Sequence, residues 1–504
     1  QSPAGPEGVF FNYGWIGYDH RAAAAHYEPW WLALHGARGV SYYATCSMDV
    51  PRGISWSLVY PSLQRTAYAS AVAEAIRDLR AGCGKVFMEY EREQPRIALL
   101  WSYPSMLVSW CESAGDQPEP REQPGSDSYG THYMSALHFR QHLNEQQLDY
   151  VYLAPDQILA SDILRQYPLL FLPFTVAVSR PLVEKLQAYV EEGGVLIGDL
   201  RCLRTDEHGT PPAGSSPLGH LFGVDRGEGK VHYGRTKVQF TAAGEGIDLA
   251  GRQVELCGRE TLAASGARAL AAHATGEPAV LVHRLGKGLT IYLNFYFPPY
   301  DRVTRELVGQ IARRAGVTAR VVAEAPAGDR PPRSYERNTF TRGPIAVHAL
   351  IRDHRRCDDT EPVRFRFAQS GHVYDVRAKK YQGNTGTLVT TLAPGETAVY
   401  AVLPYRVTGL QVQAPERAAA GSDVEFRCEV RGDGKPLGDH VLHVELRDPD
   451  GRTVAHYVKN VLARAGRIAL RIPLAVNETA GTWTVQACDV LTGATAERPF
   501  QVGP

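Results

Sequence analysis

The chain has 504 residues, of which 44% are hydrophobic and 21% are charged. This length exceeds what one hydrophobic core serves, so we expect three or four domains. Lysine plus arginine and aspartate plus glutamate number 54 each, and this balance gives no electrostatic reason to expect nucleic acid or an anionic membrane as a partner. The longest strongly apolar run, residues 167–178, contains two prolines and is too short to cross a bilayer, so it predicts a buried strand.

The first part of the chain, residues 1–92, alternates between strand and helix patterns. Strands are predicted at residues 8–13 and 40–45, and helices at residues 22–35 and 62–80, the second closed by Gly82. Such alternation produces parallel βα units. Two units can neither close a barrel nor cover both faces of a sheet. We therefore expect further βα units from an upstream segment or a second chain.

A second αβ region follows at residues 93–320. Apolar strands are predicted at residues 96–101, 149–153, 169–174, 195–200 and 290–295, with helices at residues 129–143, 180–192 and 302–315. The helix at 180–192 is the best defined, because Ser179 can cap its start, Gly193 can cap its end, and apolar residues recur at helical spacing between them. The pattern predicts an open, doubly wound sheet of flavodoxin-like type.

The remainder of the chain has only strand patterns. Residues 321–406, with a proline-rich loop at 325–333, predict a small β domain, and residues 407–504 predict an immunoglobulin-like β-sandwich. The fold class is thus multidomain α/β plus β, with two β-sandwich-like domains after the αβ regions.

The eight cysteines include no CxxC pair, so we expect no structural zinc and no other metal site. A disulfide between Cys428 and Cys488 stays open as the lesser alternative to free thiols. The alternation of side chains along a strand disfavours this disulfide, because that alternation turns Cys428 inward and Cys488 outward. The acidic turn Asp206-Glu207 suits a solvated loop better than a cation site.

No cofactor is expected in the doubly wound region. Ser102-Tyr-Pro-Ser stands after its first strand, where a dinucleotide-binding domain has a glycine-rich turn. The stretch at residues 171–179 has neither the cysteine nor the glycines of an amidotransferase nucleophile elbow. A structural role, with one face against another subunit, is the favoured interpretation.

Three segments together resemble one known family. They are WLALHGARGVSYY at residues 31–43, the stretch from YVEEGGVLIGD to LGHLFGV at residues 189–224, and VYDVRAKKYQG with LAPGETAVYAVLPY at residues 373–405. They resemble, in order, the C-terminal end of the (β/α)8 barrel, the trimerisation domain and the small β domain of glycoside hydrolase family 42. The resemblance covers about residues 8–405, and the final sandwich is an addition to it.

The resemblance implies glycosidase chemistry, in which two carboxylates flank the scissile bond. In the family the acid/base glutamate follows the fourth barrel strand, which this chain lacks. The nucleophile position at the end of the seventh strand falls near Tyr13 or Gly14, and neither is a carboxylate. This departure puts hydrolysis by the chain alone in doubt.

Catalytic groups of a barrel lie at the carboxyl ends of its strands. The candidate reactive groups are therefore Asp19 and Asp49, for which solvated loop carboxylates are the simpler alternative. Aromatic rings stack on the CH faces of sugars, and a loop histidine can bind a sugar hydroxyl. The candidate sugar contacts, which could equally cover the barrel end, are Tyr13, Trp15, Tyr18, His20 and Trp56.

Two functions follow as hypotheses. The chain is part of a β-galactosidase-like glycoside hydrolase that acts on carbohydrate, with the barrel incomplete in this chain; or it is a non-catalytic assembly or carbohydrate-binding protein that retains the family architecture. The resemblance implies a homo-oligomer, specifically a trimer. The final sandwich and the abrupt start at Gln1 favour a secreted or periplasmic protein, with the cytoplasm as the alternative.

Overall fold

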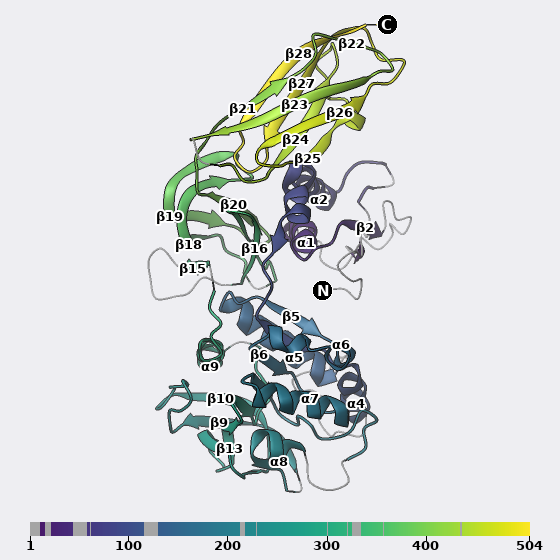
Figure 1. The fold of residues 1–504 in the computed structure, drawn as a ribbon. Helices are drawn as coiled ribbons and strands as arrows, with labels where there is room; N and C mark the ends of the chain where they lie inside the picture. Colours follow the sequence, from purple (N-terminus) through teal and green to yellow (C-terminus); the bar gives the residue numbers. More distant parts are fainter. Residues whose placement is uncertain are drawn as a thin grey trace. The chain divides into compact units, whose positions relative to one another are not determined.

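The computed structural model describes residues 11–15, 22–43, 58–60, 62–114, 130–211, 217–227, 229–299, 301–319, 321–324, 334–355, 357–433 and 436–503. The chain forms two compact units (Figure 1). Unit 1 combines Gln1–Glu93 with Arg320–Pro504, and unit 2 is Gln94–Ala319. Within the described residues, no helix is both long enough and apolar enough to cross a membrane.

Unit 2 is built on a nine-stranded sheet. Five parallel strands stand in the order β5 (Tyr150–Leu153), β4 (Ile97–Leu100), β6 (Leu169–Leu172), β7 (Val195–Gly198) and β14 (Gly288–Leu293). In chain order this is 2-1-3-4-5, the flavodoxin-like arrangement. The sheet continues in antiparallel fashion through β13 (Pro278–Leu285), β12 (Arg268–His273), β9 (Val231–Phe240) and β10 (Gln253–Glu260). The predicted doubly wound sheet is present, with an antiparallel extension that the strand patterns did not predict.

Helices cover both faces of this sheet, because its central strands are apolar on both sides. One hydrophobic core joins α5 (Gly130–Glu145) and α9 (Arg302–Arg314) to one face. The other core joins α6 (Pro155–Ala160), α7 (Arg180–Glu191) and α8 (Pro217–Phe222) to the opposite face. The α7 helix has the predicted bounds to within one residue. A further helix, α4 (Tyr103–Ala114), follows β4.

Unit 1 begins with one parallel strand pair, β1 (Phe11–Trp15) and β2 (Gly39–Tyr43), linked by α1 (Ala22–Leu34). The next predicted helix is shorter at its start than expected. It begins at Ala67, because the Thr66 side chain accepts the backbone N–H of Ala69 and caps α2 (Ala67–Asp78).

The helix breaks at Gly82, as predicted, because the backbone of this residue is not helical. The chain passes through a π-turn, Leu79–Cys83, and continues as α3 (Gly84–Glu89). Gly82 has a φ of +126°, and a Cβ there would lie 2.2 Å from the Val490 side chain. The glycine therefore serves a kink that packs against a residue 408 positions later, which no local pattern reveals.

The rest of unit 1 is β structure. A seven-stranded sheet contains β3 (Glu91–Arg92), β15 (Val322–Glu324), β16 (Tyr335–Arg342), β17 (Ile345–Arg352), β18 (Glu361–Asp375), β19 (Lys380–Leu392) and β20 (Thr397–Leu403). A sandwich follows, with one sheet of β21 (Val407–Gln413), β23 (Asp423–Gly432) and β26 (Arg467–Pro473). Its other sheet has β22 (Arg417–Ala419), β24 (His440–Arg447), β25 (Lys459–Ala463), β27 (Gly481–Asp489) and β28 (Thr495–Gly503).

These parts of unit 1 share one core. The same hydrophobic cluster contains Trp30 of α1, Phe87 of α3, Val347 of β17 and Val441 of β24. The barrel-end helices, the seven-stranded sheet and the sandwich therefore pack as one body, although their sequence patterns mark them as separate domains.

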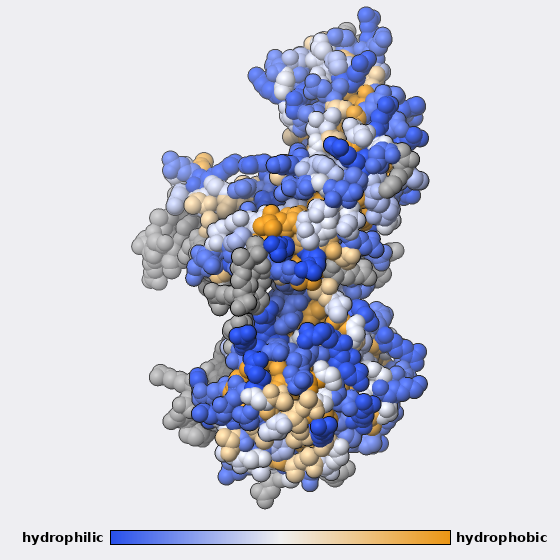
Figure 2. Space-filling model, turned by 90° about the vertical axis from the view of Figure 1, so that its left-hand side faces the viewer, coloured by the Kyte–Doolittle hydropathy of each residue, from blue (hydrophilic) through white to orange (hydrophobic). Residues whose placement is uncertain are grey.

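The cysteines of the sandwich carry free thiols. Cys428 belongs to the sandwich core together with Trp483, Val485 and Ala487, whereas Cys488 lies outside that core. The parity argument is thus correct, and the disulfide that it disfavoured is absent from this pair. In the view of Figure 2, the surface of each unit is mostly hydrophilic, with smaller groups of hydrophobic residues between the polar ones.

We expect Gly395→Ala to destabilise unit 1. Gly395 has a φ of +78°, and a Cβ there would lie 2.2 Å from the backbone oxygen of Ala23 in α1. Gly451, with a φ of +79° and nothing within 4 Å of a Cβ, is the matched control. The control substitution should cost about 1 kcal/mol for backbone strain alone. Thermal unfolding should show a clearly larger loss for Gly395→Ala, and equal losses would refute the close packing of α1 on this turn.

Candidate functional site

The sequence places the candidate site at the carboxyl ends of the two barrel strands. In the structure, Tyr13 and Trp15 belong to β1 itself rather than to the loop after it, because the strand continues through Gly14. The Cα of Trp15 pairs with that of Tyr43 at the carboxyl end of the two strands, where barrel chemistry occurs. The other candidates, Tyr18, Asp19, His20, Asp49 and Trp56, lie outside the described residues.

A buried ionic cluster fixes the helix between these strands. Glu336 of β16 is 9% exposed, and its Oε1 lies 2.9 Å from His35 Nε2 at the end of α1. Trp31 donates its indole N–H to Glu336 Oε2 at 3.1 Å. The Nδ1 of His35 lies 2.7 Å from the carbonyl oxygen of Trp31. Both ring nitrogens of His35 thus lie within hydrogen-bond distance of an oxygen atom.

The protonation of Glu336 reflects this cluster. Burial alone would raise the pKa of the Glu336 carboxyl, but His35, Asn338 and Arg92 outweigh burial and lower this pKa to about 2. Asn338 also donates to Glu336 Oε1 at 3.2 Å. The carboxylate is therefore ionised at neutral pH and holds α1 to the sheet.

A second cluster binds both barrel-end helices to the same sheet. The guanidinium of Arg377 lies 2.8 Å from Asp78 of α2 and 5.1 Å from the Trp30 ring of α1. His26 of α1 lies with Nδ1 3.1 Å from the carbonyl oxygen of Gly395. Through these contacts the sheet determines where α1 and α2 lie, and with them the strand pair.

A groove of about 630 Å³ opens beside the same helices, but at the opposite end of the strands. Its lining includes Gly36, Arg38 and Gly39, which immediately precede or begin β2, and Arg80 and Lys85 beside α2. The amino-terminal face of a barrel serves stability rather than chemistry. Among the described residues, the lining of the groove has basic side chains and no carboxylate, so it does not suit glycoside hydrolysis.

Unit 2 has a buried polar cluster at the carboxyl ends of its strands, where doubly wound proteins bind ligands. Asp199 follows β7 and is fully buried. It accepts the hydroxyl of Ser135 and the backbone N–H of Phe174, the latter at 2.5 Å. Burial raises the pKa of Asp199 to about 8, although both hydrogen bonds lower it. The carboxyl is thus held largely protonated at neutral pH.

This edge of unit 2 has no activated nucleophile among its described residues. Phe174, with a φ of +35°, occupies the turn where an amidotransferase would have its cysteine. The nearby Cys202 is fully buried, and burial together with Asp199 raises the pKa of its thiol. An activated cysteine needs the opposite shift. The cluster therefore supports the fold of this edge.

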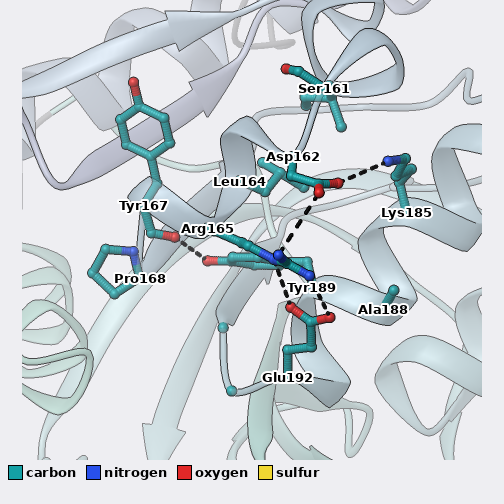
Figure 3. Close-up of a pocket in the computed structure, with 13 residues that line it drawn as sticks. Ser161, Asp162, Leu164, Arg165, Tyr167, Pro168, Lys185, Ala188, Tyr189 and Glu192 are labelled. Atoms are coloured by element: carbon teal, nitrogen blue, oxygen red, sulfur yellow. Dashed lines mark hydrogen bonds and ion pairs between the residues drawn. The ribbon is translucent and has the colours of Figure 1, made fainter.

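Another depression, of about 340 Å³, lies at the amino ends of β6 and β7 (Figure 3). Its charged groups pair with one another, Arg165 with Glu192 at 3.3 Å and Lys185 with Asp162 at 3.4 Å. These side chains are well exposed, and such pairs contribute little to stability. The location is the wrong end of an open α/β sheet for a ligand.

The acidic turn at Asp206 is closed by its own carboxylate. Asp206 Oδ1 accepts the backbone N–H groups of His208 at 3.0 Å and Thr210 at 2.8 Å. Across the described ranges, no three His, Cys, Asp or Glu side chains are grouped to hold a metal ion.

Glu336 and Asp199 were not singled out from the sequence. Asp199 had a local signal, because it directly follows a buried parallel strand. Glu336 had none, because its partners on α1 lie 301 to 305 positions earlier in the chain.

Comparison with known proteins shows what the chain is similar to. Residues 139–318 match the family model described as the β-galactosidase trimerisation domain. Over 171 residues the chain is 31% identical to β-galactosidase BglY of Alicyclobacillus acidocaldarius, a match that covers 32% of this chain and 24% of that protein.

Solved β-galactosidases share the fold. The enzyme of Bacillus circulans sp. alkalophilus aligns with a TM-score of 0.61 at 13% identity, over 78% of this chain and 55% of that chain. A family 42 β-galactosidase from G. stearothermophilus aligns with a TM-score of 0.58 at 14% identity, over 77% of this chain and 52% of that chain. The β-galactosidase of Rahnella sp. R3 aligns with a TM-score of 0.59 at 18% identity, over 76% of this chain and 53% of that chain.

These matches confirm the resemblance to glycoside hydrolase family 42 and the multidomain α/β plus β fold. The chain spans about half the length of the solved structures and about a quarter of the curated relative. The immunoglobulin-like character of the final sandwich stays a prediction.

Replacing the buried carboxylate of Glu336 should reveal how much it contributes to the free energy of unfolding. Because the folded pKa of Glu336 is about 2 and its ordinary value is 4.5, its contribution is complete above pH 4.5 and is lost as the pH falls toward 2. We expect Glu336→Gln to lower the free energy of unfolding at pH 7 by roughly 3 kcal/mol. The difference from the wild type should shrink between pH 4.5 and pH 2.

The matched control for this substitution is Glu429→Gln, which removes an exposed carboxylate that pairs with Arg467. It should change the unfolding free energy little. If both variants unfold alike at every pH, the Glu336 cluster does not hold α1 in place.

Asp199 should make the stability of unit 2 fall as the pH rises, which is opposite to the effect of Glu336 in unit 1. Its folded pKa of about 8 lies above the ordinary value of 3.8, so its contribution is complete below pH 3.8 and is lost as the pH rises through 8. Asp199→Asn should remove this loss and raise the unfolding temperature at pH 8.5 more than at pH 5. Asp162→Asn, at an exposed carboxylate of the same unit, should leave the pH dependence unchanged. A wild-type protein without this slope would contradict the protonated state.

Proposed function

We propose that the chain is part of a β-galactosidase-like glycoside hydrolase that acts on carbohydrate. The observation that supports this most is the trimerisation-domain match at residues 139–318, in a chain whose fold aligns over 78% of its length with a β-galactosidase. The missing βα units would come from an upstream segment or a second chain. The protein would act as a homo-oligomer, specifically a trimer, outside the cytoplasm.

The sugar would bind at the carboxyl end of β1 and β2. In this proposal Tyr13, Trp15, Tyr18, His20 and Trp56 contact the sugar, and Asp19 and Asp49 are the candidate reactive carboxylates. The register supports the position of Trp15, whose Cα pairs with Tyr43 at the end where barrel catalysis takes place. The α1 helix gives this end a fixed base, because Glu336 and Arg377 anchor it to the sheet.

A second candidate function is sugar binding or assembly without hydrolysis. One observation favours it: β1, Phe-Asn-Tyr-Gly-Trp, contains no carboxylate, although the family's nucleophile belongs at the end of this strand. A carbohydrate-binding protein would keep the aromatic contacts and need no nucleophile. The two candidates share a sugar site and differ only in turnover.

Trp15→Ala tests the shared site. Loss of an aromatic platform should weaken the affinity for galactose about tenfold, which corresponds to about 1.4 kcal/mol, in titration calorimetry of the native protein. Tyr60→Ala, at an aromatic side chain that is 46% exposed, is the control and should bind as the wild type does. Unchanged affinity in Trp15→Ala would remove Trp15 from the site. A wild-type protein that binds neither galactose nor galactosides would contradict both candidates.

A further inference from the structure

The strand β19 forms an open edge of the seven-stranded sheet in unit 1 (Figure 1). It pairs with β18 on one side, and no strand among the described residues pairs with its other side. Edge strands present unpaired backbone N–H and C=O groups that other chains bond, and proteins usually protect such edges with charged residues or proline. Residues 381–392 of β19 contain neither. By contrast, the edge strand β26 of the sandwich has Arg467 and Arg471.

Two features show which residues of β19 turn their backbone groups outward. Thr387 donates its N–H to Thr385 Oγ1 at 3.1 Å, within β19 itself, and Thr385 Oγ1 donates to the Thr387 carbonyl oxygen at 2.8 Å. Thr391 lies opposite Pro362 of β18, which has no N–H to exchange. Bonded and non-bonded positions alternate along an antiparallel ladder, so Thr387, Val389 and Thr391 direct their backbone groups away from β18.

The open part of this edge is only two residues long, because the chain covers it at both ends. The Thr385 hydroxyl closes one end. At the other end, Ala393 donates its N–H to Glu396 Oε2 at 2.9 Å, and its carbonyl oxygen accepts the Glu396 N–H at 3.1 Å. Val389, whose side chain is 56% exposed, and Thr391 lie between these ends. We call Val389 and Thr391 the β19 window.

We propose that the β19 window pairs with the same window of a second copy of this chain, in antiparallel orientation. When Val389 of one copy lies opposite Thr391 of the other, the two residues exchange both of their N–H···O bonds. The two-fold axis repeats this exchange, and the sheets of the two copies become one continuous sheet. The contact is isologous and therefore closes after two copies. It is independent of the proposed function, since no residue of the proposed sugar site takes part.

The length of the window favours a second copy over an unrelated extended peptide. A peptide that adds a strand to a sheet edge bonds a row of successive outward groups. In β19 the covered ends interrupt that row after two residues. A second copy presents a window of the same length with the same covered ends, so the two edges match.

Charge favours the antiparallel orientation of this pair. Lys380 begins β19 and is exposed, whereas Glu396 follows the end of the strand. Antiparallel pairing directs the lysine end of one strand toward the glutamate end of the other. Parallel pairing would bring like charges together, which is unfavourable.

The small size of the contact determines its strength. Two short backbone windows and their exposed side chains bury less than the about 1,200 Å² of a stable protein interface. We therefore expect a weak, reversible association that increases with protein concentration and not a permanent dimer.

The test is sedimentation equilibrium of the native protein from about 1 to about 1,000 μM, with a reductant because Cys111 is exposed. The wild type should double the mass of the species present at low concentration, whether that species is one chain or a trimer. Val389→Lys places a protective charge on the edge and should raise the dissociation constant at least about tenfold. The matched control, Val476→Lys at a valine of the sandwich that is 83% exposed, should associate as the wild type does.

A backbone variant and hydrogen exchange locate the contact. Thr391→Pro removes an outward N–H that β18 does not use, so the fold should tolerate it and the association should weaken. The amides of Val389 and Thr391 should exchange more slowly as the concentration rises, whereas the exchange of Thr387, which already has a partner, should not change.

Two results would overturn the β19 contact. One is a wild-type mass that stays constant over the whole concentration range. The other is an association that persists unchanged in both Val389→Lys and Thr391→Pro. Neither result affects the proposed function, which the calorimetric titration of Trp15→Ala tests separately.

Discussion

The carboxylate of Glu336 is the contact on which unit 1 depends. Burying an ionised carboxylate costs several kcal/mol unless charged and hydrogen-bonding partners compensate. Here the partners come from α1, as His35 and Trp31, and from the sheet itself, as Asn338. The cost of losing any one partner is therefore high. This makes the position of α1 on the sheet specific, which nonpolar packing alone does not ensure.

The consequences extend to the candidate site. The α1 helix leads from β1 to β2, so its position sets that of the strand pair. The contacts of Arg377 with Asp78 and the Trp30 ring add α2 to the same base. Val490, which packs against the kink at Gly82, links the sandwich to these helices. Within unit 1, the seven-stranded sheet and the sandwich thus pack against the helices that flank the strand pair.

Local patterns predicted the elements well where the determinants are local. Helix α7 has the expected bounds, because its apolar spacing and flanking glycine are sufficient to define it. The parity of Cys428 and Cys488 follows from strand alternation. Gly82 breaks the second helix at the predicted position, but the second helical segment after it and the contact with Val490 have no local signal. The long strands β9 and β10 were missed because charged residues interrupt them.

The candidate site was predictable mainly in its position. Parallel strand ends are inferred from the alternation of strands and helices, and the pairing of Trp15 with Tyr43 agrees with that inference. The residues that support the site were not predictable, because Glu336 and Arg377 meet α1 and α2 only through the tertiary fold. Long-range polar contacts of this kind produce no recognisable spacing pattern in the sequence. The resemblance to the family predicted only the architecture that contains them.

We propose above that this architecture serves glycoside hydrolysis. The most direct measurement is the release of nitrophenol from a nitrophenyl β-galactoside by the native protein. We expect release that saturates with substrate concentration and is absent with the α-anomer. A protein that binds galactose tightly but releases no nitrophenol from either anomer would contradict hydrolysis.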